Sequence, residues 1–536
     1  MLKKKFCQAA ALLLSAVLLG ALPACKKDDG TGKLFAYPID AIPVYLDPAI
    51  AESADELLVV GNCFEGLVRL DSNGKVAPGA AKSWAVSADG LTYTFQLRHG
   101  ARWKLLKNKS SGTVNEMLGS KEATEAFDTR LIADDFVFGL RRALSPATKT
   151  PGAQTLYAIE NARAVHEGTA PASALGVRAM GDDTLEIKLA APNATFLYAL
   201  TQSAAMPCSR AWFEAAHGRY GLAAKYLLCN GPFYVSRWDG NLLRMYRNDS
   251  YQGESPPAPL AVDLKVQPDA TERLRLLGDG YDAALVPADA APPPGANETE
   301  INNATLALVF QCERLPQANL RTALCAALDA KELGVSAPPG LLPGGVRVGG
   351  QPLSALAEPP QGIACDPARA RKLLEDSGKR SLSLLCAPAH EQIMRRALQA
   401  WQSLFGLRLE VVLETPEPEL LEKRLRAGDF DIAITTLRAG SSFALQALQE
   451  LIFPGAANPM RYQSGAVEAL LRGAAQTADP AETARACRQA EAHLLQNGVA
   501  YPLAAESSRF ILAAGVEGVD VSPAGDLIFF WGAKKL

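Results

Sequence analysis

The sequence has little of what enzymes and nucleic-acid-binding proteins use. It has only five histidines in 536 residues, and they lie far apart, so a histidine-based metal site or catalytic base has little support. The motifs of phosphate-binding loops, dinucleotide folds, zinc proteases and serine hydrolases are all absent from the sequence. The net charge of −3 leaves no basic surplus to neutralise nucleic-acid phosphates. We therefore predict no enzyme activity, no metal, no cofactor and no nucleic-acid partner.

Cysteines are present, but they form no recognisable pattern. When Cys7 and Cys25 are set aside, eight of the ten cysteines are scattered through the chain without a C-x-x-C pair. This spacing argues against a zinc site and against a scaffold that depends on many disulfides. Two interpretations stay open: an isolated disulfide such as Cys208 to Cys229, or free thiols buried in the core.

A long apolar run occurs only once, at the N-terminus. Three lysines (3–5) precede an apolar stretch (6–20), and the letters LPAC end the segment at Cys25. This arrangement resembles a bacterial lipoprotein signal, in which the cysteine is acylated and becomes the first mature residue. Residues 1–24 are then the signal peptide and residues 25–33 a polar tether, so that the exported body is anchored to the bacterial cell membrane. The alternative is an uncleaved transmembrane anchor, because the run nearly reaches spanning length.

The rest of the chain has the balance of a folded protein of two or three domains, with 48% apolar and 21% charged residues. Strands are predicted at 91–98 and 184–190, and a helix at 134–144. Between 381 and 437 the pattern is strand, helix, strand, helix, strand. Right-handed crossovers make such strands parallel, with both faces covered, which predicts an α/β fold. A later helix is predicted to follow an N-cap at Asp479.

Several stretches occur in an order that is similar to one known family. Residues 62–103 read NCFEGLVRLDSNGKVAPGAAKSWAVSADGLTYTFQLRHGARW, and residues 230–253 read NGPFYVSRWDGNLLRMYRNDSYQG. Shorter matching segments are LDPAIAES (46–53), ADDFVFGLRRALSP (133–146), LGVRAMGDDTLEIKLAAPNATFL (175–197), LRTALCAALDAKEL (320–333) and DPARARKLLEDSG (366–378). Together they resemble the peptide-binding family of extracellular solute-binding proteins, the oligopeptide and dipeptide receptors of ABC importers.

The resemblance implies a two-lobed α/β fold of the periplasmic-binding-protein type (class II), which closes on its ligand by a hinge motion. Lobe I then comprises residues 34–67, 190–263 and 507–536. Lobe II comprises residues 264–506. An extra strand-rich subdomain, residues 68–189, is inserted in lobe I.

The resemblance also indicates where the ligand lies. In an open α/β sheet, ligands bind at the carboxyl ends of the strands. The residues expected to floor the cleft are therefore Thr435, Thr436, Leu437, Arg438, Ala439 and Gly440. In the family this strand end pairs with the bound peptide through main-chain groups. Oligopeptide-binding relatives have an aspartate shortly after this strand, which pairs with the α-amino group of the peptide. This chain reads Ala439-Gly440-Ser441-Ser442 there, without an acid.

The missing acid leaves two alternatives. Because a buried ammonium without a counter-charge is costly, another acid replaces it, with Glu52 or Glu506 as candidates and Ala54 as a further ligand contact. Otherwise the ligand presents no free amine at this place. Arg438 favours the second alternative, because a guanidinium can hold a carboxylate bidentately. Arg438 can equally be a solvated residue at a strand end, or it can neutralise Glu506.

Three hypotheses on function follow. The first is a monomeric, lipid-anchored receptor that captures oligopeptides or dipeptides outside the membrane and delivers them to an ABC permease with its ATPase subunits. The second keeps the fold and changes the ligand to a metal chelate, haem, a sugar or another anionic small molecule. The third is an enzyme or a surface adhesin that reuses the fold.

Overall fold

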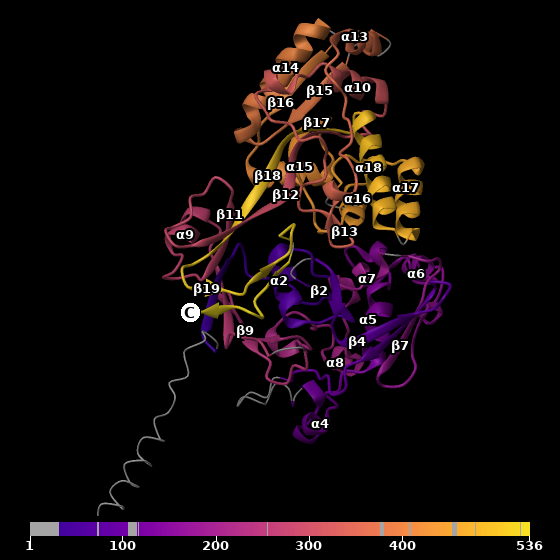
Figure 1. Ribbon diagram of the computed structural model, residues 1–536, viewed down its shortest axis with the longest axis vertical. Coiled ribbons are helices and arrows are strands. Elements are labelled where there is room, and N and C mark those ends of the chain that lie inside the picture. Colours follow the sequence, from indigo (N-terminus) through magenta and orange to yellow (C-terminus); the bar gives the residue numbers. More distant parts are fainter. Residues whose placement is uncertain are drawn as a thin grey trace, which may run out of the picture.

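The computed structural model describes residues 32–71, 74–105, 115, 117–193, 195–253, 256–375, 380–406, 409–452, 458–477, 479–525 and 527–536. The predicted signal peptide and Cys25 lie outside the described residues, as does most of the predicted tether. Within these ranges no helix is both long and apolar enough to cross a membrane. Figure 1 shows two bodies stacked along the long axis, with a further unit beside the lower body.

The lower body is built on a four-stranded sheet in the order β1-β10-β9-β8. The strands are β1 (Leu34–Ile39), β8 (Phe233–Trp238), β9 (Leu242–Arg247) and β10 (Ala261–Val266). Helix α2 (Ala54–Cys63) contacts β8 and begins with a capping box, in which Ser53 and Glu56 each accept a backbone N–H of the other. Its shorter elements are α7 (Phe196–Ala199), η3 (Ser203–Ala205), α8 (Arg210–Ala215), η4 (Ala224–Tyr226), β19 (Val516–Glu517), β20 (Asp520–Val521), β21 (Ile528–Phe529) and β22 (Lys534–Lys535).

The two ends of the chain share the core of this body. The ring centroid of Phe530 lies 5.4 Å from that of Phe35 and 5.4 Å from that of Tyr37, both on β1. Aromatic rings at this distance stabilise each other beyond the burial of their area. The C-terminal segment therefore packs into the core of this body.

The unit beside it contains a four-stranded antiparallel sheet in the order β4-β5-β7-β6. Its strands are β4 (Ala81–Val86), β5 (Thr92–Leu97), β6 (Val177–Ala179) and β7 (Thr184–Lys188), and α5 (Ala133–Ala143) packs on β6 and β7. Its remaining elements are β2 (Val68–Leu70), β3 (Val76–Pro78), α4 (Lys121–Ala126), η1 (Ala153–Leu156), α6 (Ala162–His166) and η2 (Ala172–Ala174). The predicted strands and helix of this region are confirmed to within a few residues.

The upper body is built on a six-stranded sheet in the order β11-β18-β12-β17-β15-β16. The strands are β11 (Ala283–Pro287), β12 (Asn297–Phe310), β15 (Arg380–Leu385), β16 (Leu409–Glu414), β17 (Ile432–Arg438) and β18 (Ala500–Leu512). Strands β15, β16 and β17 are parallel, which confirms the prediction. Their crossover helices are α14 (Glu391–Phe405) and α15 (Pro418–Ala427).

The two crossover helices explain why these strands are apolar without alternation. Trp401 of α14 packs in a cluster with Leu384 and Ile434, whereas Leu421 of α15 packs in another cluster with Leu385. Both faces of the sheet are therefore covered.

Further helices surround this sheet. They are α9 (Ala270–Arg275), α10 (Ala318–Ala326), α11 (Ala330–Leu333), α12 (Leu353–Leu356), α13 (Pro367–Glu375), η5 (Pro388–His390), α16 (Ala444–Ile452), α17 (Gly465–Gln476) and α18 (Pro480–Gln496), and β13 (Arg347–Val348) pairs with β14 (Gln351–Pro352). The Asp479 side chain accepts the backbone N–H of Ala481 at the start of α18, so the predicted N-cap is confirmed.

Two long strands connect the upper and lower bodies (Figure 1). Strand β18 pairs with β12 over most of its length, with register shifts between Ile301 and Ala304 and between Leu306 and Ala307. The far end of β18 pairs with β11, and Asp282 before β11 accepts the backbone N–H of Ala36 on β1 at 2.7 Å. Strand β18 therefore crosses the predicted boundary at residues 506 and 507, whereas β12 lies within the range predicted for lobe II. The hinge motion that the resemblance implies would bend these two connecting strands.

The cysteines are free throughout the described residues. Seven of them are buried and Cys365 is exposed. Cys208 and Cys229 form no disulfide, which agrees with the interpretation as buried thiols.

Candidate functional site

The predicted strand end, the last part of β17, has a free edge. Strand β15 pairs with β17 only at Ile432 and Ala433, so beyond Ile434 the described part of the chain gives β17 a strand partner on one side only, β12. The N–H of Ala439 donates to the carbonyl of Asn303 at 3.1 Å, which shows that odd-numbered residues of β17 bond to β12. The N–H and C=O groups of Thr436 and Arg438 therefore point toward the unpaired edge.

The side chains of this strand end differ in exposure. Leu437 and Ala439 are buried, Thr435 and Thr436 are half-buried, and Arg438 and Gly440 are exposed. The buried side chains of Leu437 and Ala439 hold this segment against the protein, while Arg438 and Gly440 are accessible to solvent.

Arg438 and Glu506 lie at the same level of the sheet. Both are in register with Ala304, so their side chains share one face, but they are separated by two strand spacings, about 10 Å. No ion pair joins these two described residues. The structure thus gives no support to mutual neutralisation of Arg438 and Glu506.

Glu52 and Ala54 lie at the start of α2, on the lower body, and both are exposed. The buried acid of this segment is Glu56, which accepts the backbone N–H groups of Tyr45, Glu52 and Ser53 at 3.0 to 3.1 Å. Burial alone raises the pKa of Glu56, but these hydrogen bonds bring it below its ordinary value. The Glu56 carboxylate thus fixes the segment, and the Glu52 side chain remains at the surface.

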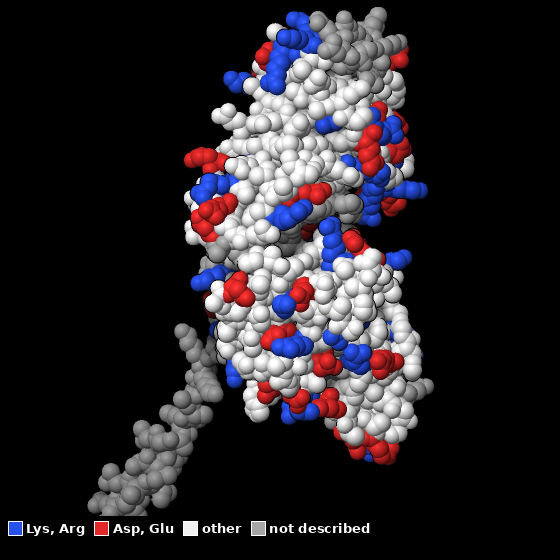
Figure 2. Space-filling model, turned by 90° about the vertical axis from the view of Figure 1, so that its right-hand side faces the viewer, with Lys and Arg blue, Asp and Glu red and all other residues white. Residues whose placement is uncertain are grey.

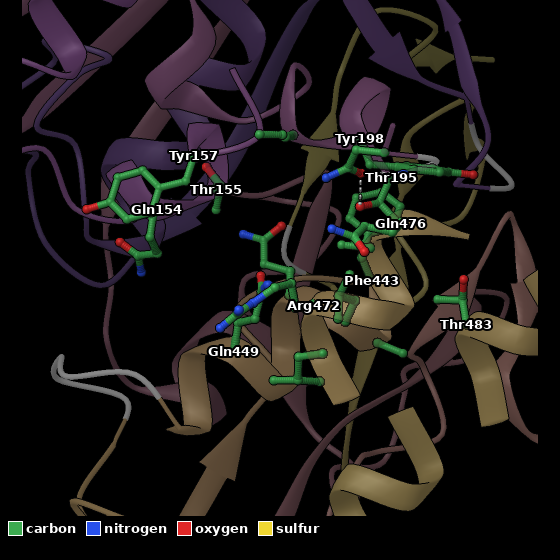
Figure 3. Close-up of a pocket in the computed structure, with 18 of the residues that line it drawn as sticks. Gln154, Thr155, Tyr157, Thr195, Tyr198, Phe443, Gln449, Arg472, Gln476 and Thr483 are labelled. Atoms are coloured by element: carbon green, nitrogen blue, oxygen red, sulfur yellow. Dashed lines mark hydrogen bonds between the residues drawn. The ribbon is translucent and has the colours of Figure 1, made fainter. Parts of the chain in front are cut away.

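A cavity of about 600 Å³ lies between the two bodies. Figure 2 shows the molecule hollowed at this level, with charged side chains of both signs along the rim. One wall comes from η1, α6 and α7, and the other from β13, α16 and α17 (Figure 3). This size and enclosure are typical of a small-molecule or peptide site.

The cavity wall is largely apolar. The rings of Tyr198 and Phe443, which come from opposite bodies, have centroids 4.3 Å apart, and Leu445, Leu471 and Val348 extend the surface. Burial raises the pKa of the Tyr198 hydroxyl above its ordinary value, so the phenol is neutral at physiological pH.

The polar groups of the cavity are mainly amides and guanidinium groups. Amides line it at Gln154, Asn193, Gln446, Gln449 and Gln476, and charged groups line it at Arg163, Arg347, Arg472 and Glu468. The Nε atom of Arg347 is buried without a hydrogen-bond partner in the described structure. In Figure 3, Arg472 lies beside Gln449 on the same wall. Arg163 is paired with Glu167 at 3.2 Å, so the guanidinium groups of Arg347 and Arg472 remain against one lining carboxylate, an excess that favours an anion.

None of the predicted site residues lines this cavity, but the two regions adjoin. Phe443, which lies three residues after Gly440, is one of the residues that line the cavity. The N–H of Gly440 donates to Glu450 Oε2 at 3.1 Å, and Glu450 Oε1 accepts Gln446 Nε2 at 3.2 Å. Gln446 is also within 3.4 Å of Gln202 on the lower body. Helix α16 therefore joins the strand end to the cavity.

Sequence reasoning missed helix α16. The signal available was the spacing of Gln446, Gln449 and Glu450, which are three and four residues apart and so share one helix face. The spacing predicts a helix face, but it does not predict that the chain reverses direction so that this face lies next to Gly440.

A metal site has no support in the described residues. They contain no group of three or more His, Cys, Asp or Glu side chains able to hold a metal ion. The groups present at the cleft are backbone N–H and C=O groups, amides, aromatic rings and guanidinium groups.

The chain matches one protein-family model and several known proteins. The model of the family "Bacterial extracellular solute-binding proteins, family 5 Middle" matches residues 75–458. The chain is 26% identical over 501 residues to the probable deoxycholate-binding periplasmic protein YgiS of Escherichia coli K12, a match that covers 88% of each chain. It is 28% identical over 264 residues to the dipeptide-binding protein of Lactococcus lactis MG1363, which covers 48% of this chain and 44% of the relative.

A solved structure shows the same fold. The substrate-binding domain of an oligopeptide ABC transporter from Bacillus anthracis superposes with a TM-score of 0.73 at 20% identity, over 94% of this chain and 99% of the other. The expected two-lobed α/β fold is therefore confirmed. Because the family model spans most of the chain, the protein belongs to the bacterial extracellular solute-binding proteins of family 5.

Proposed function

We propose that the protein captures oligopeptides or dipeptides outside the cytoplasmic membrane and delivers them to the permease and ATPase subunits of an ABC importer. The observation that carries this proposal is the free edge of β17 at Thr436 and Arg438. An extended peptide adds to such an edge as a further strand, and main-chain hydrogen bonds then hold it whatever its side chains. The names of the dipeptide-binding and oligopeptide-transporter relatives support the same ligand class.

In this proposal the predicted residues have separate roles. Thr435 to Gly440 supply the floor of the cleft, and Arg438 holds the C-terminal carboxylate of a short peptide. Glu52 and Ala54 face the ligand from lobe I, and Glu506 is a candidate partner for a cationic group. The protein performs no chemistry on the peptide and needs no cofactor.

The location in the cell follows from the N-terminus. Acylation of Cys25 after removal of residues 1–24 would anchor the protein as a monomer on the outer side of the membrane, with the polar tether leaving the lobes free to move. Palmitate labelling of the wild-type protein, and its loss in Cys25→Ser, tests this anchor.

The experiment that tests the function is native mass spectrometry of the protein purified without denaturant, followed by identification of released ligands. We expect a series of peptide masses, whose range gives the tolerated lengths. One non-peptide mass in all preparations would overturn the peptide proposal.

A second candidate is an anionic amphipathic ligand, and one observation favours it. The apolar cavity carries Arg163, Arg347 and Arg472, which suit a rigid apolar body with one carboxylate. The relative named as probably deoxycholate-binding matches this chain over 88% of its length. A thermal-shift comparison separates the two candidates: deoxycholate alone should raise the melting temperature if this candidate holds, and a mixture of short peptides should do so if the first holds.

A further inference from the structure

Two buried cysteines contact each other in the core of the lower body. Cys63 is the last residue of α2 and is 0% exposed, and Cys229 lies four residues before β8 and is 2% exposed. Their thiols hydrogen-bond to each other. The thiol of Cys208 lies instead beside Arg142 and Tyr220. The fold therefore brings Cys229 next to Cys63 and not next to Cys208.

Hydrogen bonds fix the backbone around both cysteines. The N–H of Gly231 donates to the carbonyl of Cys63 at 2.9 Å. The Asn230 side chain accepts the N–H of Glu65 at 3.1 Å and donates to the carbonyl of Glu65 at 2.8 Å. A Cβ atom added at Gly231 would lie 2.7 Å from the carbonyl carbon of Cys63, so this close approach of two backbones requires glycine. The surrounding backbone, rather than the weak contact between the thiols, thus holds the two cysteines together.

This placement suits a covalent bond. A disulfide requires two cysteines on neighbouring stretches of backbone whose side chains point toward each other. The clamped segments and the contacting thiols of Cys63 and Cys229 meet both conditions in the reduced state that the structure describes. Proteins outside the cytoplasmic membrane encounter oxidising conditions in which such a bond forms and persists.

We propose that Cys63 and Cys229 form a disulfide in the exported protein, which links the end of α2 to the segment that leads into β8. The oxidant is a second disulfide, of a protein or of a small thiol such as glutathione. Its S–S bond breaks and takes up the two electrons and two protons of the cysteines, which gives two thiols as the Cys63–Cys229 bond forms. The inference rests on the extracytoplasmic location in the proposed function and is independent of the ligand.

Burial determines when the bond can form. Burial and the neighbouring thiol raise the pKa of Cys63 well above its ordinary value, so the thiol is neutral in the folded protein. The thiolate is the form that attacks a disulfide, and an oxidant has no access to side chains that are 0% and 2% exposed. The bond therefore forms during folding, before this core closes, and the folded protein then shields it from reductants.

Peptide mapping of the full chain tests the bond. The protein is purified from the membrane and extracytoplasmic fractions, unfolded in iodoacetamide without reductant and digested with trypsin. Cys63 lies in the tryptic fragment 34–69 and Cys229 in the fragment 226–237. Most molecules should give these two fragments joined, and a reductant should separate them, whereas Cys208 and Cys325 should be alkylated. Alkylation of both Cys63 and Cys229 in the exported protein overturns the inference.

A second measurement separates the bond from the location. If the protein is found only in the cytoplasm, the proposed location fails, and the pair is then tested by refolding the full chain in a mixture of oxidised and reduced glutathione. The joined fragments should form under these conditions. Their absence from refolded protein overturns the inference whatever the location.

Variants test the bond through stability. If the two cysteines are linked, Cys63→Ala, Cys229→Ala and the double variant all remove the same bond, so all three should lower the urea midpoint of the oxidised protein equally. In protein folded and kept under reductant, the two single losses should add. The matched control is Cys325→Ala, because Cys325 is also 0% exposed and its loss should add to that of Cys63→Ala in both states. Additive losses for Cys63 and Cys229 in the oxidised protein overturn the inference.

Discussion

Arg438 is exposed at the end of β17, with its backbone at the free edge and its side chain on the face shared with Glu506. In the peptide proposal its guanidinium holds a ligand carboxylate, and charged hydrogen bonds of this kind contribute about 1.5–3 kcal/mol. Arg438→Ala should therefore weaken binding of short peptides at least tenfold, measured by titration calorimetry.

The control for Arg438 lies in the ligand. Peptides with an amidated C-terminus lack the carboxylate, so they should bind wild-type protein and Arg438→Ala equally. An unchanged dissociation constant for free-acid peptides would exclude Arg438 from the site.

Asp135 is a buried acid whose protonation couples stability to pH. Burial raises its pKa from 3.8 to about 6, although Trp103 Nε1 and the N–H of Ile132 donate to its carboxylate at 2.9 and 3.0 Å. A raised pKa means that the folded state holds the proton more tightly than the unfolded state. The associated stability is complete below about pH 4 and is lost as pH rises through about 6.

Asp135→Asn removes this titration and keeps an oxygen that can accept the same donors. The difference in unfolding free energy, wild type minus variant, should fall by on the order of 1–2 kcal/mol between pH 4 and pH 7. Urea denaturation at several pH values measures it. A difference that stays constant with pH would show that Asp135 titrates normally.

At the level of the element, the free edge of β17 predicts that successive residues of the strand differ in how well they tolerate proline. The N–H of Thr435 bonds to β12, whereas the N–H of Thr436 faces the edge. Proline removes a backbone N–H and is tolerated where that group makes no ladder bond. Thr436→Pro should therefore fold and bind peptides poorly, while Thr435→Pro should lose about 1–3 kcal/mol of stability.

Thermal unfolding and peptide titration of the two proline variants check this prediction. The variants differ by one position, so they are controls for each other. Destabilisation by both to the same extent would mean that the edge near Thr436 is covered rather than free.

Short sequence patterns were enough to predict the strands and helices that those patterns themselves determine. The strands β15, β16 and β17 are apolar because helices cover both faces, and Asp479 before Pro480 marks the start of α18. The cavity could not be predicted in this way. Its walls come from η1 and α7 on one side and from α16 and α17 on the other, which are about 250 to 320 residues apart in sequence and meet only through tertiary packing.

The same distinction holds for the site residues. The end of β17 was accessible to sequence reasoning because ligands lie at strand ends in α/β sheets. The hydrogen bond between Gly440 and Glu450 was not accessible, because it depends on helix α16 turning back over Gly440.

At the level of the whole molecule, side chains of the two bodies contact each other beside the cavity. Tyr198 and Phe443 have ring centroids 4.3 Å apart, and the Gln202 and Gln446 side chains come within 3.4 Å. Strands β12 and β18 connect the lobes, so a hinge motion at these strands would open this contact. A ligand that touches both lobes favours the closed state by its differential affinity for that state.

Cysteines at the two contact positions report closure. Gln202→Cys with Gln446→Cys, in a background with serine at Cys7, Cys25 and Cys365, should be linked by a short bismaleimide. After the protein is stripped of ligand, the linked fraction should rise several-fold when short peptides are added. The ligand contacts both lobes only when they are closed, so it raises the fraction of closed molecules and leaves the reactivity of the two thiols unchanged.

A pair within one body gives the reference for this measurement. Lys188 and Glu160 form an ion pair at 2.8 Å inside the extra subdomain, so cysteines at these positions should be linked equally with and without peptides. Linkage across the lobes that is equally insensitive to ligand would mean that the contact through Phe443 is permanent. Peptides would then have to enter a site that is already closed, and the hinge assigned to β12 and β18 would have no role in capture.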